Sequence, residues 1–280
     1  FVLSFEDITQ QLLDQRRAAW SDVARRIAHE IKNPLTPIQL AAERLQRRFG
    51  DKVEGDTATF RKLTDTVIRQ VHDMRRMVDE FSRFARMPKP TFGVEDPRDI
   101  LRQAVFLFEV AKPDIAFRIR TPGEIDPLVC DRRLLSQALT NIVKNAVEAI
   151  EEKYKDSTEP AVGRVEASLE TTDDGAVRIT VADDGIGLPE ARDAIAEPYM
   201  TTRRGGTGLG LAIVKKIVEQ HYGELEFTDN PAGQGTCVTL TLHPDRLRPL
   251  AGKGGGGSTG QAESVPGRIR TRQDREDHGA

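Results

Sequence analysis

A long run without internal glycine, followed by a second run of the same apolar rhythm, constrains this chain more than any other feature. Between Gln10 and Phe49, and again over residues 60–87, apolar side chains recur at alternating spacings of three and four residues. This spacing is typical of helices whose apolar stripe packs against another helix. The stripes comprise Trp20, Ala24, Ile27, Ile31, Pro34, Ile38, Ala41 and Leu45, and then Phe60, Leu63, Val67, Gln70, Met74, Met77, Phe81 and Phe84. The pattern predicts an antiparallel helical hairpin over residues 10–90, and two copies pairing into a dimeric four-helix bundle would bury both stripes.

The chain changes character after Pro90, where short elements replace the long helical runs. Strands are expected where apolar and polar residues alternate, and helices where apolar residues are three or four apart. The expected helices are residues 97–110, 131–153 and 208–221, and the expected strands are 115–120, 127–130, 164–170, 176–182, 224–227 and 235–242. Such mixed elements predict an α/β two-layer sandwich over residues 91–248.

The two ends of the chain differ from these domains. Residues 1–9 alternate like the last strand of a domain that begins earlier, whereas residues 249–280 are rich in glycine and charge, with few apolar side chains. A segment of the second kind cannot bury enough surface to offset the entropy lost on ordering. We expect the end of an upstream domain at residues 1–9 and a disordered tail at 249–280.

Charge and cysteine content exclude several classes of function. The chain has 41 Lys and Arg against 44 Asp and Glu, a net charge of −3, whereas extended binding to nucleic acid or an anionic membrane needs a basic surface. Cys130 and Cys237 are too few for a disulfide scaffold or a cysteine zinc cage. No apolar stretch approaches the about 20 residues that cross a membrane. We expect a soluble piece of a longer protein, in a reducing compartment and with no nucleic-acid partner.

A polar cluster lies in the middle of the first helical run. His29 falls at a heptad position that faces away from the apolar stripe, with Glu30 beside it and Asn33 one turn further along. An exposed imidazole beside a carboxylate is a candidate nucleophile with its proton acceptor, although a lone surface histidine is more often simply solvated. An HExxH zinc site is excluded because Asn33 stands where the second histidine is needed. Pro34 and Pro37 predict a bend just beyond the cluster.

Two further segments carry polar residues at unusual places. Asn141 and Asn145 lie one turn apart on an otherwise apolar helix, which favours a polar ligand, although a structural pair of capping amides gives the same pattern. Asp183 ends an expected strand, and the following Gly185 and Gly187 form a tight turn that lets the backbone approach a flat ligand. Asp-Gly is also a common hairpin turn, so this segment alone leaves both interpretations open.

A glycine-rich segment opens the last long helix. Residues 205–212 read GGTGLGLA, and exposed amides at a helix start attract phosphate oxygens. A dinucleotide-binding turn is disfavoured because no strand precedes the glycines and Leu211 replaces the third glycine. The lysine of a P-loop is also missing. A nucleotide phosphate site of another kind is the better interpretation.

In this order and spacing, the segments resemble the two-component sensor histidine kinases over residues 10–245. HEIKNPLTPIQL at 29–40 resembles the phosphoacceptor H-box, the segment around Asn141 and Asn145 the N-box, and DDGIG at 183–187 the G1 box. EPYMTT at 197–202 resembles the F-box, GTGLGLAIV at 206–214 the G2 box and GQGT at 233–236 the G3 box. The phrase ARRIAHEIKNPLTPIQLAAERL and the upstream VLSFEDIT are most similar to the NtrY-type nitrogen-regulatory sensor kinases, in which a membrane sensor and a PAS domain precede the kinase core.

The resemblance implies a role for each matching residue. His29 is then the phosphoacceptor, Glu30 the base, and Asn33 the residue that positions water when a phosphorylated partner is dephosphorylated. The implied partners are a second copy of the chain and the receiver domain of an NtrX-type response regulator. The implied location is the cytoplasmic portion of a protein anchored in the bacterial inner membrane through upstream segments.

On the nucleotide side, the resemblance implies that ATP and Mg²⁺ are bound. Asn145 then holds Mg²⁺, Asn141 lies by the phosphates and Asp183 bonds the adenine amino group. Asp184 stands where relatives usually have Asn, and Glu148 where some have a basic residue, so we assign that positive charge to a lid arginine. The expected pocket and lid residues are Gly185, Gly187, Arg203, Gly206, Gly208, Leu209 and Gly210.

The predicted function is therefore a protein histidine kinase that autophosphorylates His29 from Mg-ATP and passes the phosphoryl group to an Asp of a response regulator, in nitrogen regulation, with phosphatase activity as a further expectation. An ATPase clamp of the gyrase and Hsp90 type shares the sandwich but leaves His29 unexplained. An ATP-binding dimerisation scaffold without kinase turnover remains the main alternative. A nicotinamide oxidoreductase is the least favoured, because the strand before the glycines is missing.

Overall fold

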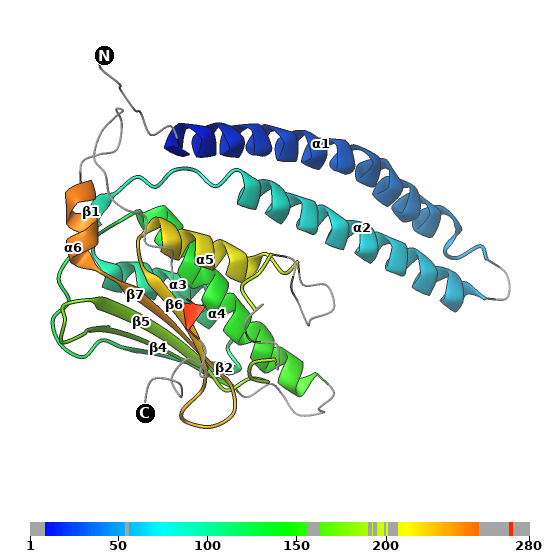
Figure 1. Cartoon of the computed structure of the whole chain (residues 1–280). Coiled ribbons are helices and arrows are strands. Elements are labelled where there is room, and N and C mark those ends of the chain that lie inside the picture. The colour runs from blue at the N-terminus through cyan, green and yellow to red at the C-terminus, as the bar shows by residue number, and fades with distance from the viewer. Residues whose placement is uncertain are drawn as a thin grey trace, which may run out of the picture. The chain divides into compact units, whose positions relative to one another are not determined.

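The computed structural model describes residues 9–53, 56–155, 163–189, 192, 195–198, 200, 207–251 and 269–270. The chain divides into two compact units, with the division between Pro88 and Lys89. Figure 1 shows a pair of long helices in the first unit and helices packed on a sheet in the second. Within the ranges given, no helix has the length and apolar character needed to cross a membrane.

The first unit is an antiparallel helical hairpin (Figure 1). Its helices are α1, Thr9–Phe49, and α2, Thr57–Ala85. Asp56 caps α2, because its carboxylate accepts a hydrogen bond from the backbone N–H of Thr59 at 3.1 Å and so satisfies a donor at the helix start. The buried stripe consists of Ala24, Ala28, Leu35 and Ala42 on α1 and Thr64, Val71, Val78 and Ser82 on α2. The helical hairpin of the predicted fold class is therefore confirmed.

The predicted apolar stripe stays largely accessible within one chain. Ile31, Ile38 and Leu45 of α1 are 41%, 46% and 47% exposed, and Leu63 of α2 is 61% exposed. The hairpin closes instead on the neighbouring stripe of mostly smaller side chains, which let two helices approach closely. The larger apolar side chains therefore remain available to pack against another surface, as pairing with a second copy requires. The dimer itself stays a prediction.

Pro34 and Pro37 lie inside α1 without ending it. Proline has no backbone N–H, so the carbonyl groups of Glu30 and Asn33, four residues earlier, lose their usual helical donor. Figure 1 shows α1 as a continuous, curved helix. The loss of two helical hydrogen bonds thus falls within two turns of His29.

The second unit is a layer of helices packed on a mixed sheet. Its long helices are α3, Pro97–Ala111, α4, Arg132–Tyr154, and α5, Gly210–Gln220. Its strands are β2, Ile115–Arg120, β4, Gly163–Thr171, β5, Val177–Asp183, β6, Glu224–Asp229, β7, Thr236–Leu242, and β8, Ile269–Arg270. They are arranged in the order β2-β4-β5-β7-β6-β8. The pairs β2–β4 and β6–β8 are parallel and the others antiparallel. The three helices lie on one side of the sheet (Figure 1), which confirms the α/β two-layer sandwich.

A small second sheet lies outside this layer. It joins β1, Gly93–Glu95, to β3, Leu128–Cys130, in antiparallel pairing. The sequence predicted β3 but not β1. Three residues are too few to display an alternation of apolar and polar side chains, so only the partner strand reveals β1.

Strand β5 brings a carboxylate to the helix-covered face of the sheet. Val177, Ile179 and Val181 are buried, and successive side chains of a strand point to opposite faces. Asp183 therefore falls on the same face as these apolar residues, and it is 4% exposed. The alternation of side chains along β5 thus places Asp183, at the end of the strand, on the buried face.

Two short helical segments follow β7. They are α6, Pro244–Leu247, and a 3₁₀ helix, Arg248–Leu250. Strand β8 pairs with β6 through Leu225–Ile269 and Glu226–Arg270. Residues 249–251 and 269–270 belong to the tail predicted from residue 249, and β8 pairs with backbone groups that β6 would otherwise present as an edge strand. The disorder of the tail stays a prediction. The other tail residues, 252–268 and 271–280, lie outside the described ranges.

Candidate functional site

Helix α1 presents His29, Glu30 and Asn33 to solvent. They lie on the side of the helix away from the buried Ala24 stripe, and one helical turn separates His29 from Asn33. Next to them, Lys32 forms an ion pair with Asp79 of α2. The three predicted residues therefore share an accessible surface of α1, and the nearby Lys32–Asp79 ion pair joins this part of α1 to α2.

Helix α4 carries Asn141 and Asn145, both half-buried, beside the start of α5. The side-chain amide of Asn141 donates to the carbonyl oxygen of Gly210 at 3.4 Å, and a Cβ added to Gly210 would lie 3.9 Å from Oδ1 of Asn145. Gly208 has a φ of +67°, a conformation that favours glycine, and Leu209 is buried. The two asparagines thus meet a helix N-terminus, the kind of place that attracts phosphate. The bond of Asn141 also gives it the structural role that the sequence left open.

Asp183 is held by backbone donors from two turns. Its Oδ1 accepts hydrogen bonds from the N–H of Gly185 at 2.9 Å and of Thr236 at 3.3 Å. The side-chain amide of Asn230 donates to its carbonyl oxygen at 2.7 Å. Because these donors come from both ends of the segment between β6 and β7 and from the turn after β5, the carboxylate has a defined orientation.

Glycines let three backbone segments approach at this place. A Cβ added to Gly185 would lie 2.6 Å from the carbonyl carbon of Ala149 on α4, and a Cβ on Gly235 would lie 1.9 Å from the carbonyl oxygen of Asp183. Gly187 and Gly235 have φ values of +86° and +128°. The turn after β5 is therefore packed between α4 and the β6–β7 turn, where larger residues do not fit. It is not an ordinary hairpin turn, since β5 pairs with β4 and β7 rather than with the segment that follows it.

Asp184 joins the ends of two strands. Its Oδ1 accepts from the N–H of Arg164 at 2.8 Å, its own N–H donates to the carbonyl of Arg164 at 3.3 Å, and its carbonyl accepts from Nζ of Lys153 at 2.6 Å. An amide oxygen accepts from a backbone N–H equally well, so Asp in place of Asn preserves this turn. The other departure, Glu148, lies 3.7 Å from Nζ of Lys144.

Two ion pairs hold the segment that leads from the G1 match to the first residue of the F-box match. Arg192 donates through both Nη atoms to the carboxylate of Asp229 at the end of β6, at 3.1 and 2.9 Å. Lys215 of α5 pairs with Glu197 at 3.0 Å. A two-pronged arginine–carboxylate pair fixes direction as well as distance. This segment is therefore tied both to the sheet and to α5.

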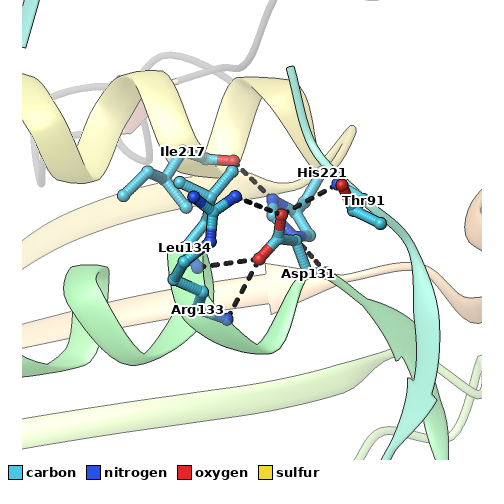
Figure 2. A network of polar contacts seen from close by, with 6 residues as sticks. All are labelled: Thr91, Asp131, Arg133, Leu134, Ile217 and His221. Atoms are coloured by element: carbon cyan, nitrogen blue, oxygen red, sulfur yellow. Dashed lines mark hydrogen bonds and ion pairs between the residues drawn. The ribbon is translucent and has the colours of Figure 1, made fainter. Parts of the chain in front are cut away.

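A buried network that the sequence did not reveal lies at the other end of α5. Figure 2 shows Asp131 accepting from the backbone N–H of Thr91 at 2.8 Å and capping α4 through the N–H of Arg133 and Leu134. The ring of His221 bonds the carbonyl of Ile217 through Nδ1 at 2.8 Å, and its Nε2 accepts from the N–H of Asp131 at 3.0 Å. The network joins the segment after Pro90 to both α4 and α5.

Burial and hydrogen bonding shift the pKa values of this network. Burial lowers the pKa of His221, against the Ile217 carbonyl and the charge of Asp131, which raise it. Burial acts to raise the pKa of Asp131, but the N–H groups of Thr91 and Leu134 and the Arg133 side chain outweigh it, so the pKa is lowered. Burial also raises the pKa of the Cys130 thiol to about 12. His221 is thus neutral and Asp131 ionised at neutral pH.

Within the second unit, α4 contacts the turn after β5 through Ala149 and Gly185, and the start of α5 through Asn141 and Gly210. The assignment of these residues to a nucleotide site stays a prediction. Arg203 and Gly206 lie outside the described residues. The histidine cluster belongs to the first unit. The sequence missed the residues that orient this place, namely Asn230, Thr236 and Arg192. Of these, Thr236 alone falls within a motif, the G3 match at 233–236, to which no single residue was assigned.

Two family models match the chain. The model described as "His Kinase A (phospho-acceptor) domain" matches residues 19–90. The model described as "Histidine kinase-, DNA gyrase B-, and HSP90-like ATPase" matches residues 130–246. The first includes His29, Glu30 and Asn33, and the second includes the residues that meet around Asp183.

Curated relatives and a solved structure are similar along most of the chain. "Nitrogen regulation protein NtrY" of Azorhizobium caulinodans is 54% identical over 243 residues, 86% of this chain and 31% of that protein. "Putative sensor histidine kinase NtrY-like" of Rickettsia felis is 34% identical, over 88% of this chain and 39% of that protein. The chain thus spans about a third of the length of these relatives. The crystal structure of the histidine kinase ThkA in complex with the response regulator TrrA has a TM-score of 0.58 at 22% identity, covering 87% of this chain and 69% of that one, and shares the fold.

Both domain types occur in the order expected, and the relatives match them continuously across the junction. The predicted family is therefore confirmed. The chain belongs to the sensor histidine kinases of two-component systems, and within them to the NtrY type.

Proposed function

We propose that this chain transfers the γ-phosphoryl group of ATP to His29 and then to an Asp of a response regulator. The observation that carries the proposal is the accessible His29, with Glu30 beside it, on a helix whose buried stripe faces elsewhere. A phosphoacceptor must be open both to the donor and to the receiver, and a histidine kept for packing would be buried.

In the transfer step, a ring nitrogen of His29 attacks the γ-phosphorus of ATP. The bond from that phosphorus to the oxygen bridging to the β-phosphate breaks, and ADP leaves. Glu30 accepts the proton of the other ring nitrogen, which keeps the attacking nitrogen's electron pair available. The amide of Asn33 is a weaker proton acceptor than the carboxylate of Glu30, and we assign Asn33 to positioning the water that hydrolyses the aspartyl phosphate of the regulator in the phosphatase reaction.

The residues around Asp183 fit an adenine nucleotide. A buried carboxylate accepts from an amino group, the glycines after β5 let the turn beside that carboxylate pack closely against α4, and the start of α5 suits phosphate. We assign Mg²⁺ to Asn145, because an amide oxygen is a ligand that Mg²⁺ accepts together with phosphates. The bound ion would offset charge on the phosphates. Arg203, Gly206, Gly208, Leu209 and Gly210 are assigned to the phosphate side of the site.

The partners and the location follow the relatives. The printed name of the Azorhizobium relative supports a role in nitrogen regulation, and the ThkA complex supports a response regulator as the receiver. We propose an NtrX-type regulator, a homodimer, and the cytoplasmic portion of a protein anchored in the bacterial inner membrane.

Incubation of the full chain with γ-labelled ATP and Mg²⁺ tests the proposal. The expected product is labelled protein whose label survives alkali and is lost in acid, as a phosphoramidate requires. His29→Gln should abolish labelling and keep ATP binding, whereas His72→Gln, at another exposed histidine of the hairpin, should change neither. Glu30→Gln should slow labelling about 100-fold.

The dephosphorylation role of Asn33 needs a second measurement. Asn33→Ala should keep most of the labelling but slow loss of phosphate from the phosphorylated regulator. A chain that binds ATP and never becomes labelled would instead support the ATP-binding scaffold. Labelling that persists in His29→Gln would reject the assigned phosphoacceptor.

A further inference from the structure

The turn between β6 and β7 forms hydrogen bonds with Asp183 at two points. At the start of the turn, the side-chain amide of Asn230 donates to the carbonyl oxygen of Asp183 at 2.7 Å. At its end, the N–H of Thr236 donates to Oδ1 of the same residue at 3.3 Å. Gly235, just before Thr236, lies so close that an added Cβ would overlap the Asp183 carbonyl. The turn therefore contacts both the backbone and the carboxylate of one residue.

Asn230 also builds the turn from which it reaches. Its Oδ1 accepts from the N–H of Ala232 at 2.9 Å, its backbone N–H donates to the carbonyl of Gly235 at 3.0 Å, and its carbonyl accepts from the N–H of Gly233 at 3.1 Å. The oxygen and the nitrogen of the Asn230 amide thus have separate roles. The oxygen stabilises the turn, and the nitrogen joins it to β5.

This bond continues the contact between two strands beyond their ladder. The last pair of β5 with β7 is Ala182 with Cys237, so Asp183 lies one residue past the regular pairing. The side-chain amide of Asn230 holds the backbone at that position. A shift there would move the carboxylate, and hydrogen bonds weaken steeply as angle and distance change.

We propose that Asn230 is a positioning residue for base recognition: it fixes the carboxylate of Asp183 where the exocyclic amino group of an adenine nucleotide donates to it. The inference rests on the proposed ATP site and deepens it. Asn230 does not touch the nucleotide in this proposal, and acts only through Asp183. We therefore expect loss of the Asn230 donor to lower the binding affinity only for nucleotides whose base carries the exocyclic amino group.

The test measures equilibrium binding of ATP and of purine riboside triphosphate, which lacks the exocyclic amino group, to the full chain with Mg²⁺. Asn230→Asp keeps an oxygen for the Ala232 N–H and removes the donor to Asp183. Asn230→Ser also retains an acceptor but adds no charge. Both variants should bind ATP about tenfold more weakly, and should bind purine riboside triphosphate within about twofold of the unchanged chain.

Two controls separate positioning from general loss of structure. Thr172→Ala removes a side-chain bond to the Ala176 N–H in the β4–β5 turn, at the opposite end of the sheet, and should leave both affinities unchanged. In an Asp183→Asn background, Asn230→Ser should cause little further loss of ATP affinity, because both changes act on one contact.

Equal losses for the two nucleotides, or unchanged ATP affinity in both Asn230 variants, would overturn the inference while leaving the ATP site intact. An unchanged chain that binds no ATP would reject the proposed function, and the inference with it. ATP binding by the unchanged chain distinguishes these two outcomes.

Discussion

At the scale of single residues, His221 shows how burial selects a protonation state. Nδ1 bonds the Ile217 carbonyl and so carries the proton, which leaves Nε2 to accept from the Asp131 N–H (Figure 2). A second proton on Nε2 would remove that acceptor and place a charge in a fully buried side chain. Burial therefore lowers the pKa of His221 in the folded chain, against the Ile217 carbonyl and the charge of Asp131, which raise it.

This shift predicts a loss of stability on mild acidification. Below the ordinary histidine pKa of 6.5, the unfolded chain binds a proton that the folded chain does not, so the free energy of unfolding falls as the pH falls. One proton contributes at most about 1.4 kcal/mol per pH unit. Urea titrations followed by circular dichroism between pH 7 and pH 5 should show a steeper decline for the unchanged chain than for His221→Gln.

The titration of Asp131 does not affect this comparison between pH 7 and pH 5. The pKa of Asp131 is lowered from 3.8, so its stabilising contribution is lost only at still lower pH. The other histidines are present in both chains and cancel in the comparison. Parallel pH curves for the two chains would contradict a neutral His221.

At the scale of elements, the β6–β7 turn offers two glycines that separate strain from contact. Gly233 and Gly235 have φ values of +147° and +128°, where other residues are strained. A Cβ on Gly233 would meet nothing within 4 Å, whereas a Cβ on Gly235 would lie 1.9 Å from the Asp183 carbonyl oxygen. The two positions therefore share a backbone cost and differ in what a side chain would displace.

Alanine at each position should give different results. Each substitution should cost about 1–3 kcal/mol in the free energy of unfolding from the strained backbone. Only Gly235→Ala should also weaken ATP binding, by more than about tenfold, because it pushes Asp183 out of place. Calorimetric titration with ATP and a thermal unfolding curve measure the two effects. Equal ATP affinity in both variants would show that the turn does not position the site.

At the scale of the whole molecule, the hairpin leaves a stripe of large apolar side chains uncovered. Ile31 is 41% exposed although it lies in the predicted heptad stripe, whereas Leu35, one turn further along, is buried. Contiguous exposed apolar surface marks an interaction site. A second copy offers the same stripe and so matches it in length and character.

Ile31→Asp should therefore shift the chain from dimer to monomer. An aspartate at this stripe would be buried unpaired in the bundle, and such burial is strongly unfavourable. Thr36→Asp, at an exposed position of the same helix off the stripe, is the matched control and should remain dimeric. Sedimentation velocity of both variants, with helicity checked by circular dichroism, gives the result. A dimer that survives Ile31→Asp would place the interface elsewhere.

The sequence by itself determined the kinds of elements, the two-part architecture and most of the candidate site. Helical and strand periodicities are local properties, so the spacing around Ile31 and the alternation around Ile179 could be recognised within a few residues. The chemical motifs are local as well. His29 with Glu30, Asn141 with Asn145, and Asp183 with its glycines each lie within one short segment.

Only the tertiary structure decided which stripe of α1 closes the hairpin and which residues orient Asp183. The choice between the stripe of Ala28 and Leu35 and the stripe of Ile31 depends on how closely two helices approach, a property of the packed pair. Asn230 meets Asp183 across 47 residues, and His221 meets Asp131 across 90. No local pattern records such pairs, because their hydrogen bonds form only after distant strands and helices have packed and excluded water.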